Sequence, residues 1–141
     1  METVGGGVPQ PERLRFQDFK FERLANGRCR ARVVLSWADG RQFVGEAEGV
    51  ISQAGELRCS AGAAIRALER VVHPTLGFEL LGVKAVRAFD ATVVIVSLSA
   101  RTETSVSRLV GSCLAETDPS QGAALAVLNA TNRMLGNYYF R

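Results

Sequence analysis

The sequence predicts an α+β fold of two βββα repeats, in which antiparallel sheets are covered by two helices. The first observation is an internal repeat: Phe-Val-Gly at 43–45 recurs as Leu-Val-Gly at 109–111, and Ser-x-Gly-Ala-Ala at 60–64 recurs at 120–124. The second is the common order of both copies, in which an apolar segment and a glycine precede a polar gap and a helix start. Repeats of this kind are typical of a duplicated structural unit.

Length and composition agree with one domain. The chain has 141 residues with 47% hydrophobic content, which is enough to bury a core without disulfides or metals. Residues 1–12 contain three consecutive glycines, two prolines and little to bury, so we expect a flexible N-terminal tail. Residues 13–141 are then a single duplicated βββα domain.

Charge and cysteine content narrow the class of protein. The net charge of +3 is too small for a histone-like protein, and the three cysteines at 29, 59 and 113 are too widely spaced for a disulfide framework or a zinc site. Neither a signal-like N-terminal segment nor a run of about 18 apolar residues occurs. We therefore expect a cytoplasmic protein with no metal, cofactor or membrane partner.

The first three strands are expected at 14–24, 28–38 and 42–50. Ala25-Asn26-Gly27 is a strong hairpin signal between the first two, and Asp39-Gly40 is the next turn.

The register of the first hairpin can be predicted from side-chain parity. A three-residue loop with Gly27 in the left-handed conformation puts apolar residues opposite one another, whereas a two-residue loop mixes core and solvent faces. The favoured register gives the pairs Phe21–Ala31, Phe19–Val33, Glu22–Arg30 and Lys20–Arg32. Phe16 has the other parity, which indicates a bulge.

The first helix is expected to begin at Ser60, as N-cap after the polar gap 52–58, and to run to about His73. Apolar residues recur at helical spacing with charged residues opposite them, so one stripe covers a sheet. The stripe consists of Ala64, Ile65, Leu68, Val71 and Val72.

The second unit repeats this plan. Strands are expected at 78–89, 92–100 and 106–115, with a turn near Asp90-Ala91. Asp118-Pro119-Ser120-Gln121 supplies an N-cap, an N1 proline and a capping-box glutamine for a helix to about Leu135.

Two segments suggest a further contact surface. Val93–Val96 is apolar on both faces, as expected of a strand covered by a helix on one side and by another surface, such as a second copy of the chain, on the other. Residues 137–141 carry three aromatics, which we expect either to dock on the domain or to lie at an interface.

Little in the sequence points to catalysis. The single histidine, His73, has no acid or cysteine beside it, so we expect a surface position near a helix end. No Gly-x-Gly-x-x-Gly or Walker pattern follows a strand, which argues against a nucleotide site. The sequence therefore predicts a protein that is not an enzyme.

Candidate ligand contacts lie at the two expected helix starts. Capping explains Ser60 and Ser120 better than nucleophilic catalysis does. The N–H groups of a helix N-terminus attract anions, and a nearby glycine permits close approach, so a carboxylate or phosphate is the expected ligand. The candidate ligand-binding residues are Ser60, Gly62, Ala63, Ser120 and Gly122.

Three arginines, Arg28, Arg30 and Arg32, alternate along one expected strand and allow two interpretations. They form either a basic stripe for nucleic acid or a ladder of ion pairs across the sheet. The expected register favours the ladder, whose acidic partners are Glu22, Glu46 and Glu48. We therefore do not expect a nucleic-acid partner.

A polar patch in the last helix consists of Asn129, Asn132 and Arg133. Asn132 shares the apolar stripe of this helix, so we expect it to be partly buried and to fix the helix against a turn or a partner subunit. Cys113 is expected in the core.

The element order and the run 109–135 resemble the C-terminal regulatory and dimerisation domain of 2-isopropylmalate synthase and citramalate synthase. The last helix of that family commonly ends in an Asn-Ala-x-Asn-Arg-x-Leu pattern, matched here by Asn129, Ala130, Asn132, Arg133 and Leu135. The resemblance covers about residues 14–136 in element order. It implies a homodimer that binds a feedback amino acid, here without the catalytic domain.

These observations predict a non-catalytic, homodimeric regulatory or ligand-sensing domain. Its ligand would be a small carboxylate or an amino acid, held between a helix start and the dimer seam, where it changes subunit packing. The alternatives are a nucleic-acid-binding module that uses the surface arginines and a pure protein-interaction module.

Overall fold

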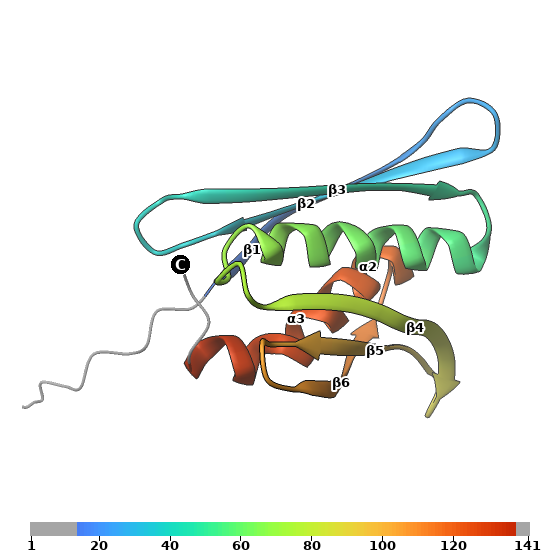
Figure 1. The fold of residues 1–141 in the computed structure, drawn as a ribbon. Helices are drawn as coiled ribbons and strands as arrows, with labels where there is room; N and C mark the ends of the chain where they lie inside the picture. Colours follow the sequence, from blue (N-terminus) through green and yellow to red (C-terminus); the bar gives the residue numbers. More distant parts are fainter. Residues whose placement is uncertain (1–13, 138–141) are drawn as a thin grey trace, which may run out of the picture.

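The computed structural model describes residues 14–137 and has the predicted α+β fold (Figure 1). The elements in chain order are β1 (Arg15–Arg23), β2 (Arg28–Ser36), β3 (Gln42–Val50), α2 (Gln53–Glu69), β4 (Gly77–Ala88), β5 (Ala91–Arg101), β6 (Val106–Ala115) and α3 (Pro119–Asn137). The tail expected at 1–12 and the aromatic residues from 138 onwards lie outside the described residues.

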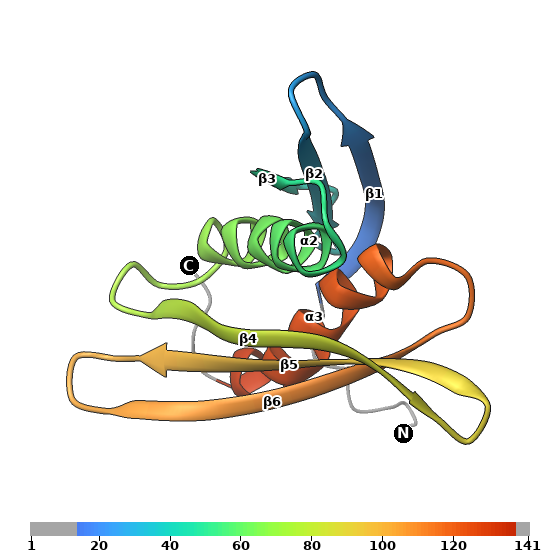
Figure 2. The same cartoon turned by 90° about the vertical axis from the view of Figure 1, so that its right-hand side faces the viewer.

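The two helices lie between two antiparallel sheets (Figure 2). One sheet has the order β1-β2-β3 and the other β4-β5-β6. Helix α2 packs on β2 and β3, α3 packs on β5 and β6, and the helices contact each other. Each unit therefore covers the inner face of its own sheet, and the two outer faces point away from the helices.

The β1–β2 hairpin has the predicted register. Phe21 pairs with Ala31 and Phe19 with Val33, and the pairing shifts between Phe16 and Asp18, so the predicted bulge is confirmed. The three-residue loop is closed by a hydrogen bond of 2.7 Å from the Leu24 N–H to the Arg28 carbonyl. Gly27 has a φ of 69°, the predicted left-handed conformation.

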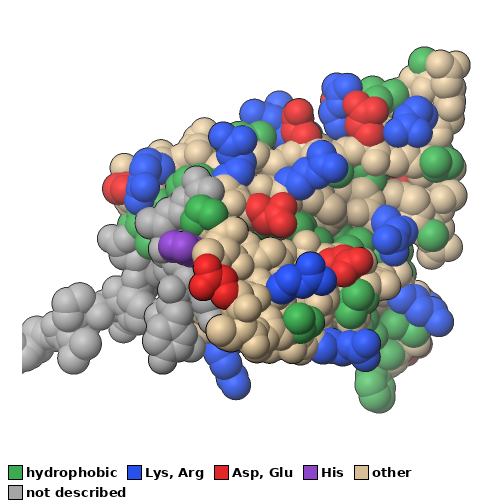
Figure 3. Space-filling model, in the orientation of Figure 1, with side chains coloured by type: hydrophobic (Ala, Val, Ile, Leu, Met, Phe, Trp, Pro, Cys, Tyr) green, Lys and Arg blue, Asp and Glu red, His purple; other side chains and the backbone are tan. Residues whose placement is uncertain are grey.

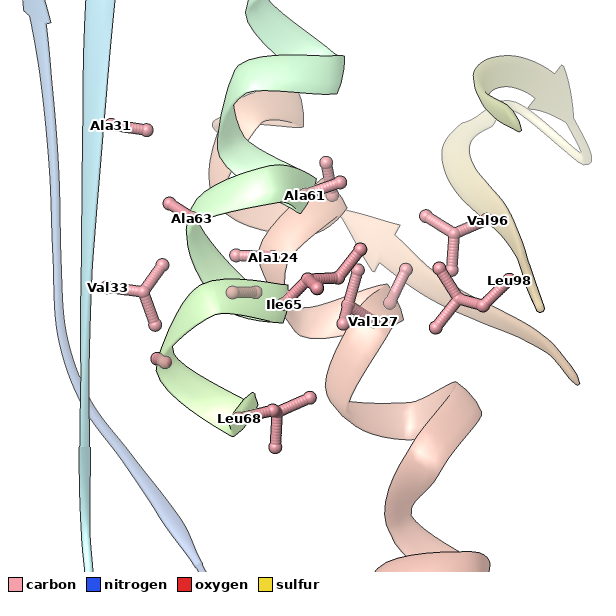
Figure 4. Packing of buried hydrophobic residues seen from close by; sticks show 14 of the residues in the cluster. Ala31, Val33, Ala61, Ala63, Ile65, Leu68, Val96, Leu98, Ala124 and Val127 are labelled. Atoms are coloured by element: carbon pink, nitrogen blue, oxygen red, sulfur yellow. The ribbon is translucent and has the colours of Figure 1, made fainter. Parts of the chain in front are cut away.

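The core fills the space between the sheets (Figure 4). Inner-facing valines and leucines of the central strands, such as Val33 and Leu98, meet Ile65, Leu68 and Val127 from the helices. Many other buried helix positions are alanines, which allow close approach between layers. They are Ala61, Ala63, Ala64, Ala67, Ala123, Ala124 and Ala126.

Two glycines show that the halves are equivalent. A Cβ on Gly45 would lie 2.2 Å from both the Ala63 carbonyl oxygen and the Ala67 nitrogen. In the second unit, a Cβ on Gly111 would likewise lie 2.3 Å from the carbonyl oxygen of Ala126. The strand repeat is therefore confirmed, but the helix alignment was wrong: Ala63 corresponds to Ala126, whereas the Ser-x-Gly-Ala-Ala match equates it with Ala123.

The predicted start of the first helix at Ser60 is also wrong. Helix α2 begins at Gln53, and its N-cap is Ser52, whose Oγ accepts a hydrogen bond of 2.9 Å from the Gly55 N–H. Gly55 is required there because a Cβ would lie 2.1 Å from the Val50 carbonyl oxygen. The apparent polar gap is thus the first part of the helix, which ends at Glu69, before the predicted end near His73.

The start of α3 is as predicted. Asp118 Oδ1 accepts a hydrogen bond of 3.0 Å from the Ser120 N–H, and Pro119 is the first helical residue. The proline lacks an N–H that would otherwise be unsatisfied at this position.

Candidate functional site

The first group of predicted ligand contacts lies inside a helix. Ser60, Gly62 and Ala63 are in the middle of α2, and Ser60 and Ala63 are buried. The Ser60 hydroxyl donates to the Glu56 carbonyl oxygen at 2.9 Å. Backbone N–H groups within a helix already bond to preceding carbonyls. These three residues are therefore not at a helix N-terminus, and the expected anion site does not exist at them.

The second group, Ser120 and Gly122, does lie at a helix start. A hollow of about 160 Å³ is formed here by the end of β6 and the first turns of α3. The Ser120 N–H donates to Asp118 Oδ1 and the Gly122 N–H to the Asp118 carbonyl oxygen, both at 3.0 Å. Asp118 therefore occupies these donors and adds a negative charge, which opposes binding of a carboxylate or phosphate at the same groups.

The outer face of the β1–β3 sheet carries the predicted ion-pair ladder. Arg30 lies 2.9 Å from Glu48 and 4.0 Å from Glu22, and Arg32 lies 3.6 Å from Glu46. The hydrogen bond with Glu48 and the charge of that carboxylate raise the pKa of Arg30 above its ordinary value. Basic and acidic groups alternate over this part of the surface (Figure 3), so the arginines do not form a bare basic stripe.

The cysteines are placed as unreactive thiols. Cys29 and Cys59 are buried side chains of β2 and α2, and burial raises the pKa of Cys59 to about 12. The Cys59 thiol donates to the Ala47 carbonyl oxygen at 3.1 Å. Cys113 packs against the core as a partly buried residue, and burial raises its pKa as well. A thiol held protonated in this way is a poor nucleophile.

His73 has a local structural role. Its exposed ring contacts the Thr75 hydroxyl at 2.9 Å through Nδ1, beyond the end of α2. Within residues 14–137, no group of three or more His, Cys, Asp or Glu side chains is arranged to hold a metal ion. In the same range, no helix has the length and apolar character needed to cross a bilayer.

Side chains from the helices cover part of one edge of each sheet, at β3 and at β6. Arg66 of α2 donates to the Glu46 carbonyl oxygen of β3 at 3.1 Å, and Asn129 of α3 donates to the Ser112 carbonyl oxygen of β6 at 2.7 Å. These contacts protect edge groups that could otherwise pair with another strand. Asn132, which we expected to be partly buried and to fix the helix, is exposed. Asn129, also exposed, is the asparagine that ties the helix to β6.

The outer face of the β4–β6 sheet exposes large apolar side chains among polar ones. Strand alternation turns Val94, Val96 and Leu98 towards the helices, where they are fully buried, so the intervening residues face outwards. We call the outward-facing apolar residues of this sheet the apolar sheet face. They are Val86, Val93, Ile95, Val106, Val110 and Leu114.

Exposure distinguishes this face from a core surface. Val106 and Val110 are 63% and 64% exposed, and Leu114 is 54% exposed. Charged outward-facing side chains, such as Lys84 and Glu79 of β4, lie beside the apolar residues. Ser97, Arg108 and Ser112 also face outwards, between the apolar residues. An exposed group of large apolar side chains is typical of a protein interaction site.

The sequence indicated only part of this face. The run Val93–Val96 was expected to contact a second surface, but the contribution of β6 was missed. The signal in the sequence is that β6 carries apolar residues on both of its faces. Val110 and Leu114 lie on the outer face, and Leu109 and Cys113 lie on the inner face. A strand that contacts a core with one face needs apolar residues only at every second position.

Comparison with known proteins adds no assignment. No protein-family model matches the chain, and no curated protein is significantly similar to it in sequence.

Proposed function

We propose that this chain is a non-catalytic, dimeric regulatory domain whose two copies associate through the apolar sheet face. The observation that carries the proposal is the contrast between the outer faces of two otherwise equivalent sheets. The face of β1–β3 pairs Arg30 with Glu48 and Arg32 with Glu46, whereas the equivalent face of β4–β6 exposes Val110 and Leu114.

The size of the apolar sheet face supports a reversible dimer. A three-stranded face about ten residues long measures about 33 Å along the strands and about 14 Å across them, so two copies would bury on the order of 900 Å² together. That area is near the lower limit for a specific interface, about 1,000 Å². We therefore expect a dimer that dissociates on dilution, with a Kd in about the micromolar range.

The regulatory part of the proposal rests on the resemblance to the amino-acid feedback domain. A small carboxylate or amino acid that binds at the dimer seam would stabilise one packing of the subunits over another. Because Asp118 occupies the N–H groups of Ser120 and Gly122, the ligand would have to find its polar partners elsewhere along the seam. A pure protein-interaction module would use the same apolar face without a ligand.

Sedimentation velocity across a concentration series tests association. The wild-type chain should form a dimer as concentration rises, and Val110→Lys should remain a monomer because a desolvated ammonium group opposes face-to-face packing. Gln42→Lys is the matched control, since it adds the same charge to the outer face of the β1–β3 sheet. A wild-type chain that remains monomeric, or an equal effect of both variants, would refute the proposed dimer.

A thermal-shift screen with the standard amino acids and small carboxylates tests ligand sensing. A ligand present at about 100 times its Kd stabilises the folded state by about 2.7 kcal/mol, which is readily detected. A shift in the wild-type chain that is weaker in Val110→Lys would place the ligand at the seam. No shift with any compound would leave the interaction module as the better account.

A further inference from the structure

The turn between β4 and β5 holds a phenylalanine fully in solvent. Ala88 and Ala91 form the last pair of the two strands, so Phe89 and Asp90 are the central turn residues. Their φ angles are 53° and 61°, as a type I′ turn requires. Phe89 is 103% exposed, so none of residues 14–137 covers its side chain.

Neither property of Phe89 helps the fold. The left-handed conformation crowds the Cβ of any L residue, and an exposed ring gains nothing from burial. The β1–β2 loop of the same chain has Asn26 and Gly27 at φ angles of 64° and 69°, residue types that tolerate this conformation. A bulky apolar residue that is both strained and exposed is best explained by contact with another molecule.

The turn continues the apolar sheet face. Val86 and Val93 lie opposite each other, two positions before the last pair of the ladder and on its outer face. Val93 also pairs with Leu114 of β6. Hydrophobic side chains project at the lower right of Figure 3, where Figure 1 shows the β4–β5 turn. Phe89 and the apolar sheet face therefore form one surface.

A second copy of the chain matches this surface in charge. Two sheets packed face to face about a two-fold axis perpendicular to the strands place opposite ends of each strand together. Lys84 pairs with Ile95 and Glu79 with Ser99, one outward-facing position on either side of Ser97. An axis over Ser97 would thus bring Lys84 of each copy over the partner's Glu79. On β6 it would bring Val110 over its own counterpart and Leu114 over the partner's Val106.

We propose that Phe89 of each protomer anchors this dimer by docking near the start of the partner's β4. The same two-fold axis carries each turn to that end of the partner sheet, where Phe78, Glu79 and Arg101 line an open groove of about 400 Å³. The Arg101 guanidinium offers a cation–π contact to the ring, and the added aromatic area raises a marginal interface above its lower limit. This inference rests on the proposed dimer.

The variant Phe89→Asn tests the anchor. It should keep or raise the urea midpoint of the dilute monomer, because asparagine tolerates the left-handed turn position. It should also raise the dimer Kd at least about tenfold in sedimentation velocity, as loss of a buried aromatic anchor does. Phe89→Trp, which restores an aromatic ring, should recover most of the affinity, and a photo-cross-linking phenylalanine at 89 should label partner residues 77–79 or 99–101.

The outcomes separate the anchor from the dimer itself. If Val110→Lys abolishes the dimer and Phe89→Asn leaves its Kd unchanged, the anchor is refuted and the apolar seam stands. If the wild-type chain is monomeric at every concentration, both proposals fail. Binding of a monomer to anionic lipid vesicles that depends on Phe89 would also overturn the anchor, because the turn would then contact a membrane.

Discussion

Replacing Gly111 by alanine should separate the second helix from its sheet. The added methyl would lie 2.3 Å from the Ala126 carbonyl oxygen and 2.5 Å from the Ala130 nitrogen. Carbon contacts become favourable only at about 3.5 Å, so α3 must move by about 1 Å. Both opposing atoms are helix backbone, and α3 also packs on α2, so no side-chain rotation relieves the overlap. Overpacking costs about 1–3 kcal/mol, and we expect the upper end of that range.

Urea unfolding followed by circular dichroism measures this loss. With a slope of about 1–3 kcal/mol per molar urea, a loss of about 3 kcal/mol should lower the midpoint by about 1–3 M. Gly82→Ala is the control, because a Cβ at this β4 position meets no atom within 4 Å, and we expect a change of less than about 0.5 kcal/mol. Gly45→Ala should behave like Gly111→Ala. Equal stabilities for the Gly111 and Gly82 variants would refute the packing argument.

Two further predictions concern α2. Ser52→Ala should lower the free energy of unfolding by about 1 kcal/mol through loss of the N-cap, whereas Ser60→Ala should leave urea stability nearly unchanged, because this hydroxyl bonds only to its own helix; the opposite order would restore Ser60 as the cap. The buried Cys59 thiol, with its pKa raised from 9.0 to about 12, should resist Ellman's reagent in the native state. Because the folded state keeps this thiol protonated, burial of the thiol contributes fully to stability below pH 9. This contribution is lost as the pH rises towards 12, so thermal midpoints should fall over that range. Rapid labelling of Cys59 at pH 8 would contradict its placement.

The features predicted correctly are those set by local parity and turn chemistry. The β1–β2 register follows from the requirement that Phe19 and Phe21 share a face with Val33 and Ala31, because a shift by one residue would expose both aromatic rings. The α3 start follows from Asp118 and Pro119, which satisfy or remove orphan N–H groups. Neither inference required knowledge of tertiary contacts.

The start of α2 could not be predicted in this way. Gln53, Ala54 and Gly55 have no apolar stripe, and a glycine in the first turn normally weakens a helix. Gly55 is needed only because the Val50 carbonyl approaches it. The repeat was misaligned for a related reason, since the identity at Ser60 and Ser120 is a coincidence of composition and the packing glycines Gly45 and Gly111 define the true correspondence.

The exposed turn was missed because its residues contradict turn propensity. Asp90-Ala91 was the expected turn, since aspartate tolerates positive φ and phenylalanine does not. The structure instead centres the turn on Phe89 and Asp90, one residue earlier. Departures from local preference of this kind are expected where another requirement, such as binding, has determined the residue.

Self-association through the apolar sheet face is tested most directly by a dilution series of two-dimensional ¹⁵N–¹H NMR spectra. Amide peaks of β4, β5 and β6, with the largest changes near Val110 and Phe89, should move as the protein is concentrated, while those of β1–β3 stay in place. Spectra that do not change with concentration, or changes confined to β1–β3, would contradict the account.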